Sequence, residues 1–515
     1  MKRNILSSLV LALITISIYA QDPNILWQRT IGGSGDEHVT IAIETTDGGF
    51  IVGGYSNSNI SGEKTENSRG GKDYWVLKFD SSGNIEWQKT IGGDQDDTLN
   101  DLKQTQDGGY ILAGSSASGI SGEKTEPSRG NMDYWVLKLS ATGNIEWQKT
   151  FGGDALDIAL DILQIPDGSY ILAGNSQSGI SGDRTINISV NQDTWVLKLD
   201  FNGNIEWQKA FPLGDAVFCQ GLDLTDDGGY IIGNSDAQTI YGALKISSTG
   251  GFLWQNGYSG LGPSTFMTNI KKTSDSGYIL TGFSDTNAGG AKSEDSMGNF
   301  DYWILKVDQN GEKEWDNTIG GLYGESCYNT LESSEGGYFV TGFSSSDISG
   351  DKTEDSNGLA DYWIIKLNDL GIIEWQNTMG GENDESFPKS CQLIDGTYIV
   401  AGKSNSNISG DKTENSRGGQ DFWIVKHAQT LGLEENTFAT AITLYPSPAK
   451  NTLQLNTQDK TINQVNIYTM TGSKVLQLDV DTISPTVDVS SLASGVYYLQ
   501  LYSGKNVALK KFVKE

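Results

Sequence analysis

The chain has 515 residues and a formal net charge of −29, with 64 Gly, only 9 Pro and 10% aromatic residues. About −33 of that charge falls on residues 21–439, because both ends of the chain are basic. Such an acidic body repels phosphates and anionic lipid head groups, which argues against nucleic acids and membrane surfaces as partners. Three widely separated cysteines, Cys219, Cys327 and Cys391, cannot form a disulfide framework.

The first twenty residues predict a cleaved signal peptide. Lys2 and Arg3 form a basic start, residues 5–18 are apolar, and Ala20 offers a small residue before a cleavage point at Gln21. The alternative, a membrane anchor, needs about twenty apolar residues. No later segment of the sequence is apolar enough to span a membrane. We therefore expect a secreted protein, processed between Ala20 and Gln21.

A repeat of about sixty residues occupies the region that follows. One anchor is Asn-Ile-Glu-Trp-Gln-Lys, found at 84–89, 144–149 and 204–209, and a second is Asp-Tyr-Trp-Val-Leu-Lys, found at 73–78 and 133–138. A third anchor, Asp-Gly-Gly, follows the first by 20 or 21 residues. Because three anchors keep a fixed phase, we count seven repeats, marked by Trp27, Trp87, Trp147, Trp207, Trp254, Trp315 and Trp375.

Each repeat predicts four antiparallel strands. In the first copy these are 39–45, 50–55, 74–79 and 85–90, and the Asp-Gly-Gly at 47–49 supplies a tight turn between the first two. Four such strands repeated radially are the pattern of a β-propeller. A linear solenoid is the alternative, but its terminal repeats should be polar caps.

The ends of the repeat region favour a closed ring. Residues 25–30 form a fourth strand with no third strand before it, and residues 421–426 form a third strand with no fourth after it. Pairing the two completes one blade and removes two exposed sheet edges. The predicted fold is therefore all-β, a seven-bladed β-propeller over 21–427 closed by its N-terminal strand. We expect its tryptophans to pack between blades, and Lys78 and its equivalents to pair with acids.

Beyond a linker at 428–440, residues 441–515 carry a different pattern. Leu-Tyr-Pro-Ser-Pro at 444–448 is followed by short alternating strands, Ser-Gly-Val-Tyr-Tyr at 494–498 and a basic tail. This run resembles the type A sorting domain of the type IX secretion system of Bacteroidota, with Ser447 where that family usually has Asn. The motif residues are Tyr445, Pro446, Pro448, Gly472, Gly495, Tyr497, Lys510 and Lys511.

The resemblance implies a small immunoglobulin-like β-sandwich and export across the outer membrane, with the type IX machinery as partner. In that family the domain is commonly cleaved, and the cargo is released or attached to the cell surface. The alternating pattern and turn spacing independently predict a small β-sandwich. We expect an extracellular or outer-membrane-surface protein.

Two acidic loops per repeat fall on one face of the predicted propeller, since both follow even-numbered strands. They are 32–37 and 61–71 in the first copy. The second loop spaces carboxylates three and seven residues apart, among Asn, Ser and carbonyl oxygens that suit calcium. The alternative is a solvated loop held to its neighbour by Lys–Glu pairs. The calcium candidates are Glu63, Glu66, Asp73, Asp351, Glu354 and Asp361.

No catalytic constellation is evident. The only histidines are His38, placed in the first acidic loop, and His427, placed at the linker, and no zinc pair or nucleophile–base pair emerges. An Asp/Glu pair of glycosidase type stays open, although acids that recur in each repeat favour structure or repeated weak binding. The leading hypothesis is a secreted binding module for a polysaccharide or a protein. The alternatives are a carbohydrate-active enzyme that uses Asp or Glu of this face, and a structural surface protein.

Overall fold

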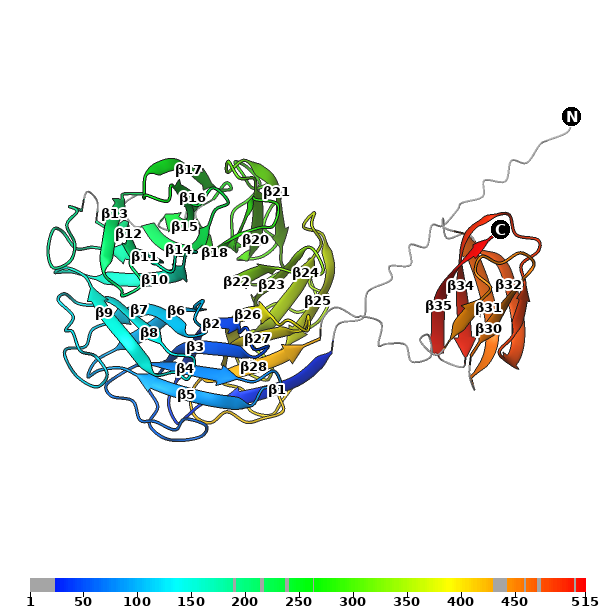
Figure 1. Cartoon of the computed structure of the whole chain (residues 1–515), viewed down its shortest axis with the longest axis horizontal. Helices are drawn as coiled ribbons and strands as arrows, with labels where there is room; N and C mark the ends of the chain where they lie inside the picture. Colours follow the sequence, from blue (N-terminus) through cyan, green and yellow to red (C-terminus); the bar gives the residue numbers. More distant parts are fainter. Residues whose placement is uncertain are drawn as a thin grey trace, which may run out of the picture. The chain divides into compact units, whose positions relative to one another are not determined.

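The computed structural model describes residues 24–188, 191–213, 217–236, 240–262, 264–428, 442–457, 460–469, 474–503 and 506–515. The predicted processing residues Ala20 and Gln21, nearly all of the predicted linker and Gly472 lie outside these ranges. The chain divides into two compact units, Met1–Gln429 and Thr430–Glu515. All regular elements among the described residues are β-strands (Figure 1). None of the described residues forms a helix capable of crossing a membrane.

The described part of the first unit consists of seven four-stranded antiparallel sheets arranged around a centre (Figure 1). The first sheet contains β2 (Glu37–Glu44), β3 (Phe50–Ser56), β4 (Asp73–Phe79) and β5 (Ile85–Ile91). The second and third contain β6 (Asp97–Gln104), β7 (Tyr110–Ser116), β8 (Asp133–Leu139), β9 (Ile145–Phe151), β10 (Asp157–Gln164), β11 (Tyr170–Ser176), β12 (Asp193–Leu199) and β13 (Ile205–Phe211).

The remaining sheets repeat this order. The fourth and fifth contain β14 (Val217–Leu224), β15 (Tyr230–Asp236), β16 (Ile240–Ile246), β17 (Phe252–Tyr258), β18 (Thr265–Lys272), β19 (Tyr278–Ser284), β20 (Asp301–Val307) and β21 (Lys313–Ile319). The sixth and seventh contain β22 (Glu325–Glu332), β23 (Tyr338–Ser344), β24 (Asp361–Leu367), β25 (Ile373–Met379), β26 (Glu385–Gln392), β27 (Tyr398–Ser404), β28 (Asp421–His427) and, from the start of the chain, β1 (Ile25–Ile31).

The first strand of a repeat begins earlier than the sequence pattern predicts. The Glu37 side chain is fully buried and accepts hydrogen bonds from Ser56 Oγ (2.7 Å), Ser58 Oγ (2.6 Å) and the Gly33 backbone N–H (2.9 Å). An acid that hydrophobic patterning assigns to the loop therefore belongs to β2, because its hydrogen bonds offset the cost of burial. As a correction to the sequence analysis, His38 lies in β2 and not in the acidic loop.

Tryptophan and tyrosine side chains join neighbouring sheets. Trp75 and its third-strand equivalents are fully buried. The Tyr74 hydroxyl donates to the Trp135 carbonyl of the next sheet (3.1 Å), and the two rings lie 5.0 Å apart. The fourth-strand Trp27 packs on the turn at Gly83, where φ is 83° and a Cβ would come within 2.7 Å of the indole. A buried aromatic side chain of this kind stabilises the fold by about 2–3 kcal/mol.

The third-strand lysines pair with acids, as the sequence predicts. Lys78 Nζ lies 2.8 Å from Asp47 and 2.9 Å from Glu86. The same kind of ion pair is made by Lys138, Lys198, Lys245, Lys306, Lys366 and Lys426.

The chain ends of the first unit meet in one sheet. β1 pairs antiparallel with β28, from Ile25 opposite His427 to Ile31 opposite Phe422. His427 is therefore the last residue of β28, one residue beyond the strand that the sequence predicts at 421–426. Its buried ring stacks on Trp375 (5.7 Å), and burial lowers its pKa to about 4. We call the contact between this sheet and the first sheet the seam.

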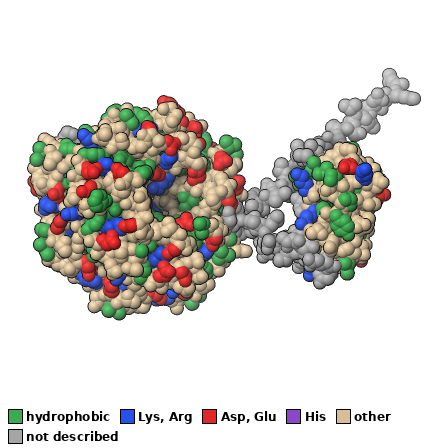
Figure 2. Space-filling view, in the orientation of Figure 1, with side chains coloured by type: hydrophobic (Ala, Val, Ile, Leu, Met, Phe, Trp, Pro, Cys, Tyr) green, Lys and Arg blue, Asp and Glu red, His purple; other side chains and the backbone are tan. Residues whose placement is uncertain are grey.

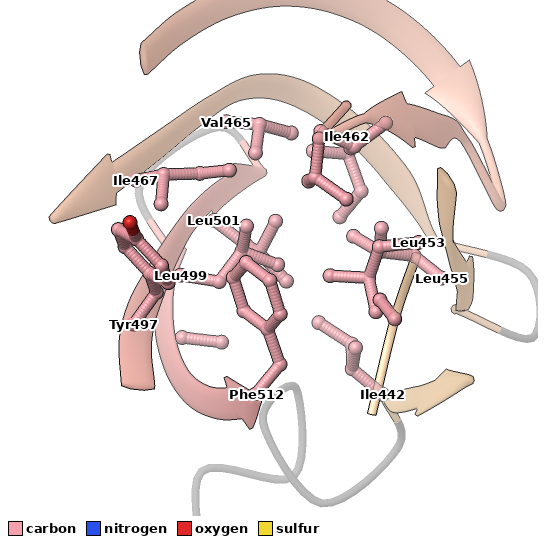
Figure 3. Packing of buried hydrophobic residues seen from close by; sticks show 14 residues of the cluster. Ile442, Leu453, Leu455, Ile462, Val465, Ile467, Tyr497, Leu499, Leu501 and Phe512 are labelled. Atoms are coloured by element: carbon pink, nitrogen blue, oxygen red, sulfur yellow. The ribbon is translucent and has the colours of Figure 1, made fainter. Parts of the chain in front are cut away.

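The second unit is built from two sheets. One orders β29 (Thr443–Tyr445), β30 (Thr452–Asn456) and β33 (Thr486–Asp488). The other orders β32 (Lys474–Ile483), β31 (Thr461–Thr469), β34 (Gly495–Ser503) and β35 (Asn506–Lys514). Both sheets contribute buried side chains to one hydrophobic core, including Leu453, Val465, Leu499 and Phe512 (Figure 3).

Of the predicted sorting residues, Tyr497 is structural, since it stacks on Phe512 (5.7 Å) and its hydroxyl donates to the Ala493 carbonyl (3.0 Å). Tyr445, at the end of β29, is 51% exposed, and Pro446 and Pro448 follow it. Gly495 begins β34. Lys510 and Lys511 lie on β35.

The β1–β28 pairing predicts a stability effect. We expect a chain that starts at residue 32 to melt at least about 5 °C below one that starts at residue 21, because it loses a strand ladder and the burial of Trp27 and Ile31, about 4 kcal/mol. Circular dichroism melting measures the difference. Leu26→Ser, at a position of β1 that is 52% exposed, is the control and should leave the melting temperature unchanged. Equal melting of the two chains would contradict the role given to β1.

Candidate functional site

In the first repeat the two acidic loops are bonded to each other and to the next sheet. Within the first sheet, the Glu63 N–H donates to the Gly32 carbonyl (3.0 Å). Arg69 pairs with Glu123 of the second sheet (2.6 Å). The same Arg–acid contact crosses the seam from Arg417 to Glu63 (3.0 Å). The sequence analysis offers Lys–Glu pairs between neighbouring loops as an alternative to calcium. The pairs observed here contain arginine in place of lysine.

The loop lysine has a different position. Lys64 is buried, donates to Thr90 Oγ1 (2.5 Å) and lies 5.3 Å from the centre of the Trp75 ring. Burial lowers its pKa to about 8. A planar guanidinium reaches a carboxylate with several donors at once, which explains why arginine and not lysine joins the loops.

The six calcium candidates do not converge on one point. Each accepts a hydrogen bond from a different backbone N–H: Glu63 from Gly32, Glu66 from Thr90, Asp73 from Arg69, Asp351 from Gly320, Glu354 from Thr378 and Asp361 from Asn357. Among the described residues, no group of three His, Cys, Asp or Glu side chains is placed to hold a metal ion. Calcium binding by these residues stays a prediction.

Buried carboxyl groups meet between neighbouring sheets. Burial, together with the nearby Glu385, raises the pKa of Asp361 to about 7, and one Asp361 oxygen has no hydrogen-bond partner. Burial likewise raises the pKa of Asp73, Asp133 and Asp301 to about 6. These carboxyl groups are fully buried and recur around the ring. These four carboxyl groups therefore do not form a solvent-facing pair of glycosidase type.

The raised carboxyl pKa values predict that the propeller becomes more stable on mild acidification. The folded chain keeps protons that the unfolded chain releases above about pH 4, so this stabilisation is lost as pH rises through about 6–7. His38 and His427, whose pKa values are lowered to about 4, make the fold less stable on acidification, but the four carboxyl groups outnumber them. We expect the melting temperature to rise from about pH 8 to about pH 5.5. Asp361→Asn should reduce this rise, whereas Glu382→Gln, at an exposed position, should not.

The inner strands of the seven sheets surround a central channel, and Figure 2 shows a hollow at the centre of the propeller with Lys or Arg side chains beside it. One cavity of about 890 Å³ is lined by Lys103 and Lys271 among others. Another, of about 260 Å³, is lined by His38, Tyr328 and Lys389 among others. The channel therefore offers two chemically different ends, and the second is lined by aromatic side chains.

Eight half-buried rings form a continuous group, which we call the aromatic arc, and three of them, His38, Tyr328 and Phe387, line this second cavity. Its inner members follow one another closely: Tyr328 to Phe387 (4.7 Å), Phe387 to His38 (5.3 Å) and His38 to Tyr55 (5.0 Å), between ring centres. The outer members continue from Tyr328 through Phe283 at 6.1 Å. The arc comprises His38, Tyr55, Phe266, Phe283, Phe300, Tyr328, Phe343 and Phe387.

The arc breaks the symmetry of the propeller. In the first sheet His38 lies opposite Tyr55, and in the fifth Phe266 lies opposite Phe283. The corresponding pairs are Thr98 with Ser115 in the second sheet and Ile158 with Asn175 in the third. The rings therefore gather on the first, fifth, sixth and seventh sheets. Because a structural role would recur in each repeat, this asymmetry marks the arc as the candidate functional site.

Phe387 occupies its place at a conformational cost. Its φ is 55°, in the left-handed region that non-glycine residues rarely adopt, and it precedes Pro388 at a register shift of β26. Such a conformation costs about 1–3 kcal/mol and persists where the surroundings hold it. It places the ring between His38 and Tyr328, at the centre of the arc.

Three lysines adjoin the arc. Lys403 Nζ lies 4.5 Å from the centre of the Phe387 ring and Lys72 Nζ lies 5.1 Å from that of Tyr55. Lys389 Nζ donates to the Tyr328 carbonyl (3.1 Å). Burial, with the charges of these three lysines, lowers the pKa of His38 to about 4, so that its ring is neutral near pH 7.

A cavity of about 610 Å³ borders the arc across the seam. It is lined on one side by Tyr55, Asn57 and Lys72 and on the other by Asn405 and Gln420. Sequence reasoning named His38 only as a histidine without a catalytic partner, and it did not find the arc. The signal was available as aromatic residues at positions where the second repeat carries Thr98 and Ser115 and the third carries Ile158 and Asn175.

Residues 443–515 match the family of secretion system C-terminal sorting domains. This match confirms the resemblance to a type IX sorting domain, and the chain is a secreted or cell-surface protein exported by that system. The chain is also 22% identical over 387 residues to the regulatory protein FlaEY of Caulobacter vibrioides, covering 72% of this chain and 36% of that protein. The chain thus spans about a third of the length of this relative.

Two solved structures are similar in part. The Pan2 WD40 domain of Neurospora crassa shows 10% identity and a TM-score of 0.44, covering 79% of this chain and 97% of that one. PorZ, an essential surface component of the type IX secretion system of Porphyromonas gingivalis, shows 9% identity and a TM-score of 0.22, covering 96% of this chain and 86% of that one.

Proposed function

We propose that this chain is a seven-bladed propeller, closed by β1, that binds carbohydrate chains at the aromatic arc outside the cell. An immunoglobulin-like C-terminal sandwich, over about 441–515, serves as its export domain. The observation that carries the proposal is the asymmetry of the arc, whose half-buried rings gather on one side of the channel. The acidic loops recur in most repeats and serve the scaffold.

The chemistry of the arc suits sugars. The face of a sugar ring presents weakly positive C–H bonds, which match the negative face of an aromatic ring. Amide side chains of Asn57, Asn405 and Gln420 line the neighbouring cavity and can pair with hydroxyl groups. A concave surface of rings with a few convergent polar groups is the usual form of a small-ligand site.

A protein ligand is the second candidate. Isoleucines at equivalent loop positions are 61–70% exposed on the first, second, third, sixth and seventh sheets, which is unusual for large apolar side chains. These residues are Ile60, Ile120, Ile180, Ile348 and Ile408. They lie on the loops and outside the arc, so variants of the arc separate the two candidates.

The carbohydrate proposal predicts that arc variants lose glycan binding. We expect Tyr328→Ala and Tyr55→Ala to weaken binding about tenfold, since each removes one stacking surface worth about 1–1.5 kcal/mol. Binding is measured on an array of polysaccharides with the purified chain from residue 21 onward. Phe201→Ala, at a turn residue that is 68% exposed, is the matched control and should bind normally.

The outcomes separate the alternatives. Absence of glycan binding, with or without millimolar calcium, would overturn the proposal. Capture of a protein partner whose binding is unchanged by the arc variants would favour the exposed isoleucines as the site. Release of reducing ends from mixed polysaccharides would favour the enzyme alternative.

The sorting domain predicts the route of export. A chain that lacks residues 441–515 should accumulate in the periplasm of the producing cells, because the signal peptide carries it across the inner membrane only. Immunoblots of periplasm, cell surface and medium measure this. Lys510→Ala with Lys511→Ala should reduce export, whereas Lys474→Ala, at another exposed lysine of the same unit, is the control. Normal export of the truncated chain would contradict the assignment.

A further inference from the structure

The lysines at the aromatic arc lack the carboxylate partners that the third-strand lysines have. Lys78, for example, is held between two carboxylates, and Lys64 donates to a threonine hydroxyl. In the part of the chain that the structure describes, Lys72, Lys389 and Lys403 form no ion pair within 4.0 Å. Their ammonium groups are instead held beside Tyr55, Tyr328 and Phe387.

Two of the carboxylates that face these lysines accept hydrogen bonds from backbone N–H groups. Asp36 accepts a hydrogen bond from the Gln420 N–H (3.1 Å) across the seam. Asp96 accepts one from the Lys72 N–H (3.0 Å). The charges of Asp36 and Asp384 raise the pKa of Lys403, but they form no ion pair with it. Burial lowers the pKa by more, so that it lies below the usual value. The ammonium groups of Lys72 and Lys403 therefore remain available to a ligand.

These contacts exclude a cationic ligand at the arc. A ring face that already carries a lysine ammonium at 4.5 or 5.1 Å repels a second cation. The neutral His38 ring adds no charge of its own near pH 7. The arc thus brings three lysines to one part of a strongly acidic propeller, and ammonium groups that lack a carboxylate in an ion pair complement a negative group.

We infer that the ligand of the arc is an acidic glycan, whose sugar ring stacks on the aromatic side chains while its carboxylate or sulfate group is bound by Lys72 and Lys403, with Lys389 at the channel end. This inference rests on the proposed function and adds to it the charge of the sugar. Two segments that are far apart in the sequence supply the two main cations, and the charges of both act on His38.

Matched pairs of polysaccharides test the inference. The purified chain from residue 21 onward is titrated with polygalacturonate and with its methyl-esterified form, and with dextran sulfate and dextran. We expect each acidic member to bind at least about tenfold more tightly than its neutral partner, and the difference to shrink as salt screens the charges. The pair that shows the larger difference identifies carboxylate or sulfate as the group bound.

Lysine variants test which side chains bind the acidic group of the polysaccharide. Lys72→Gln combined with Lys403→Gln should weaken binding of the acidic member about tenfold and change binding of the neutral member less than about twofold. Lys209→Gln, at an exposed position of β13, is the control and should change neither. Unchanged melting temperatures would show that the variants fold.

The failures of the two proposals are distinguishable. If acidic and neutral members bind equally and the double variant is indifferent, the inference is wrong while the carbohydrate function stands. If no member of either pair binds, the carbohydrate function itself is wrong.

Discussion

The pairing of β1 with β28 is the constraint on which the candidate site depends. It brings a strand from the start of the chain into the last sheet, so that the first and seventh sheets pack together. The contact is reinforced by Trp75 against Phe422 (5.0 Å between ring centres) and by Arg417 with Glu63. Because the 610 Å³ cavity is lined from both sheets, it exists only when the ring is closed.

The propeller separates its scaffold from its site by repetition. Features that occur in most repeats, such as the buried tryptophans and the bonded acidic loops, hold neighbouring sheets together. Features that occur on only some sheets, above all the aromatic arc and its lysines, have no counterpart in that scaffold. A rigid ring can carry a site on its variable loops and channel residues, which is how repeated folds commonly carry function.

The charge of the chain has to be considered at two scales. The net charge of −29 governs solubility and the long-range field, and it argues against nucleic acid as a partner. Within about one Debye length, individual side chains decide what binds. At the arc those side chains are Lys72 and Lys403, half-buried against rings, so a local preference for an acidic group is compatible with an acidic protein.

The sequence by itself determined the repeat, the four strands of each sheet and the export domain, because periodic hydrophobic patterns and turn residues are local signals. It also determined that the first and last strands lack partners. Only the tertiary structure decided what the loops and channel contain. Tyr55, Tyr328 and Phe387 are far apart in the sequence, and their meeting depends on the curvature of the ring. The burial of Glu37, and with it the place of His38, follows from hydrogen bonds that hydrophobic patterning cannot register.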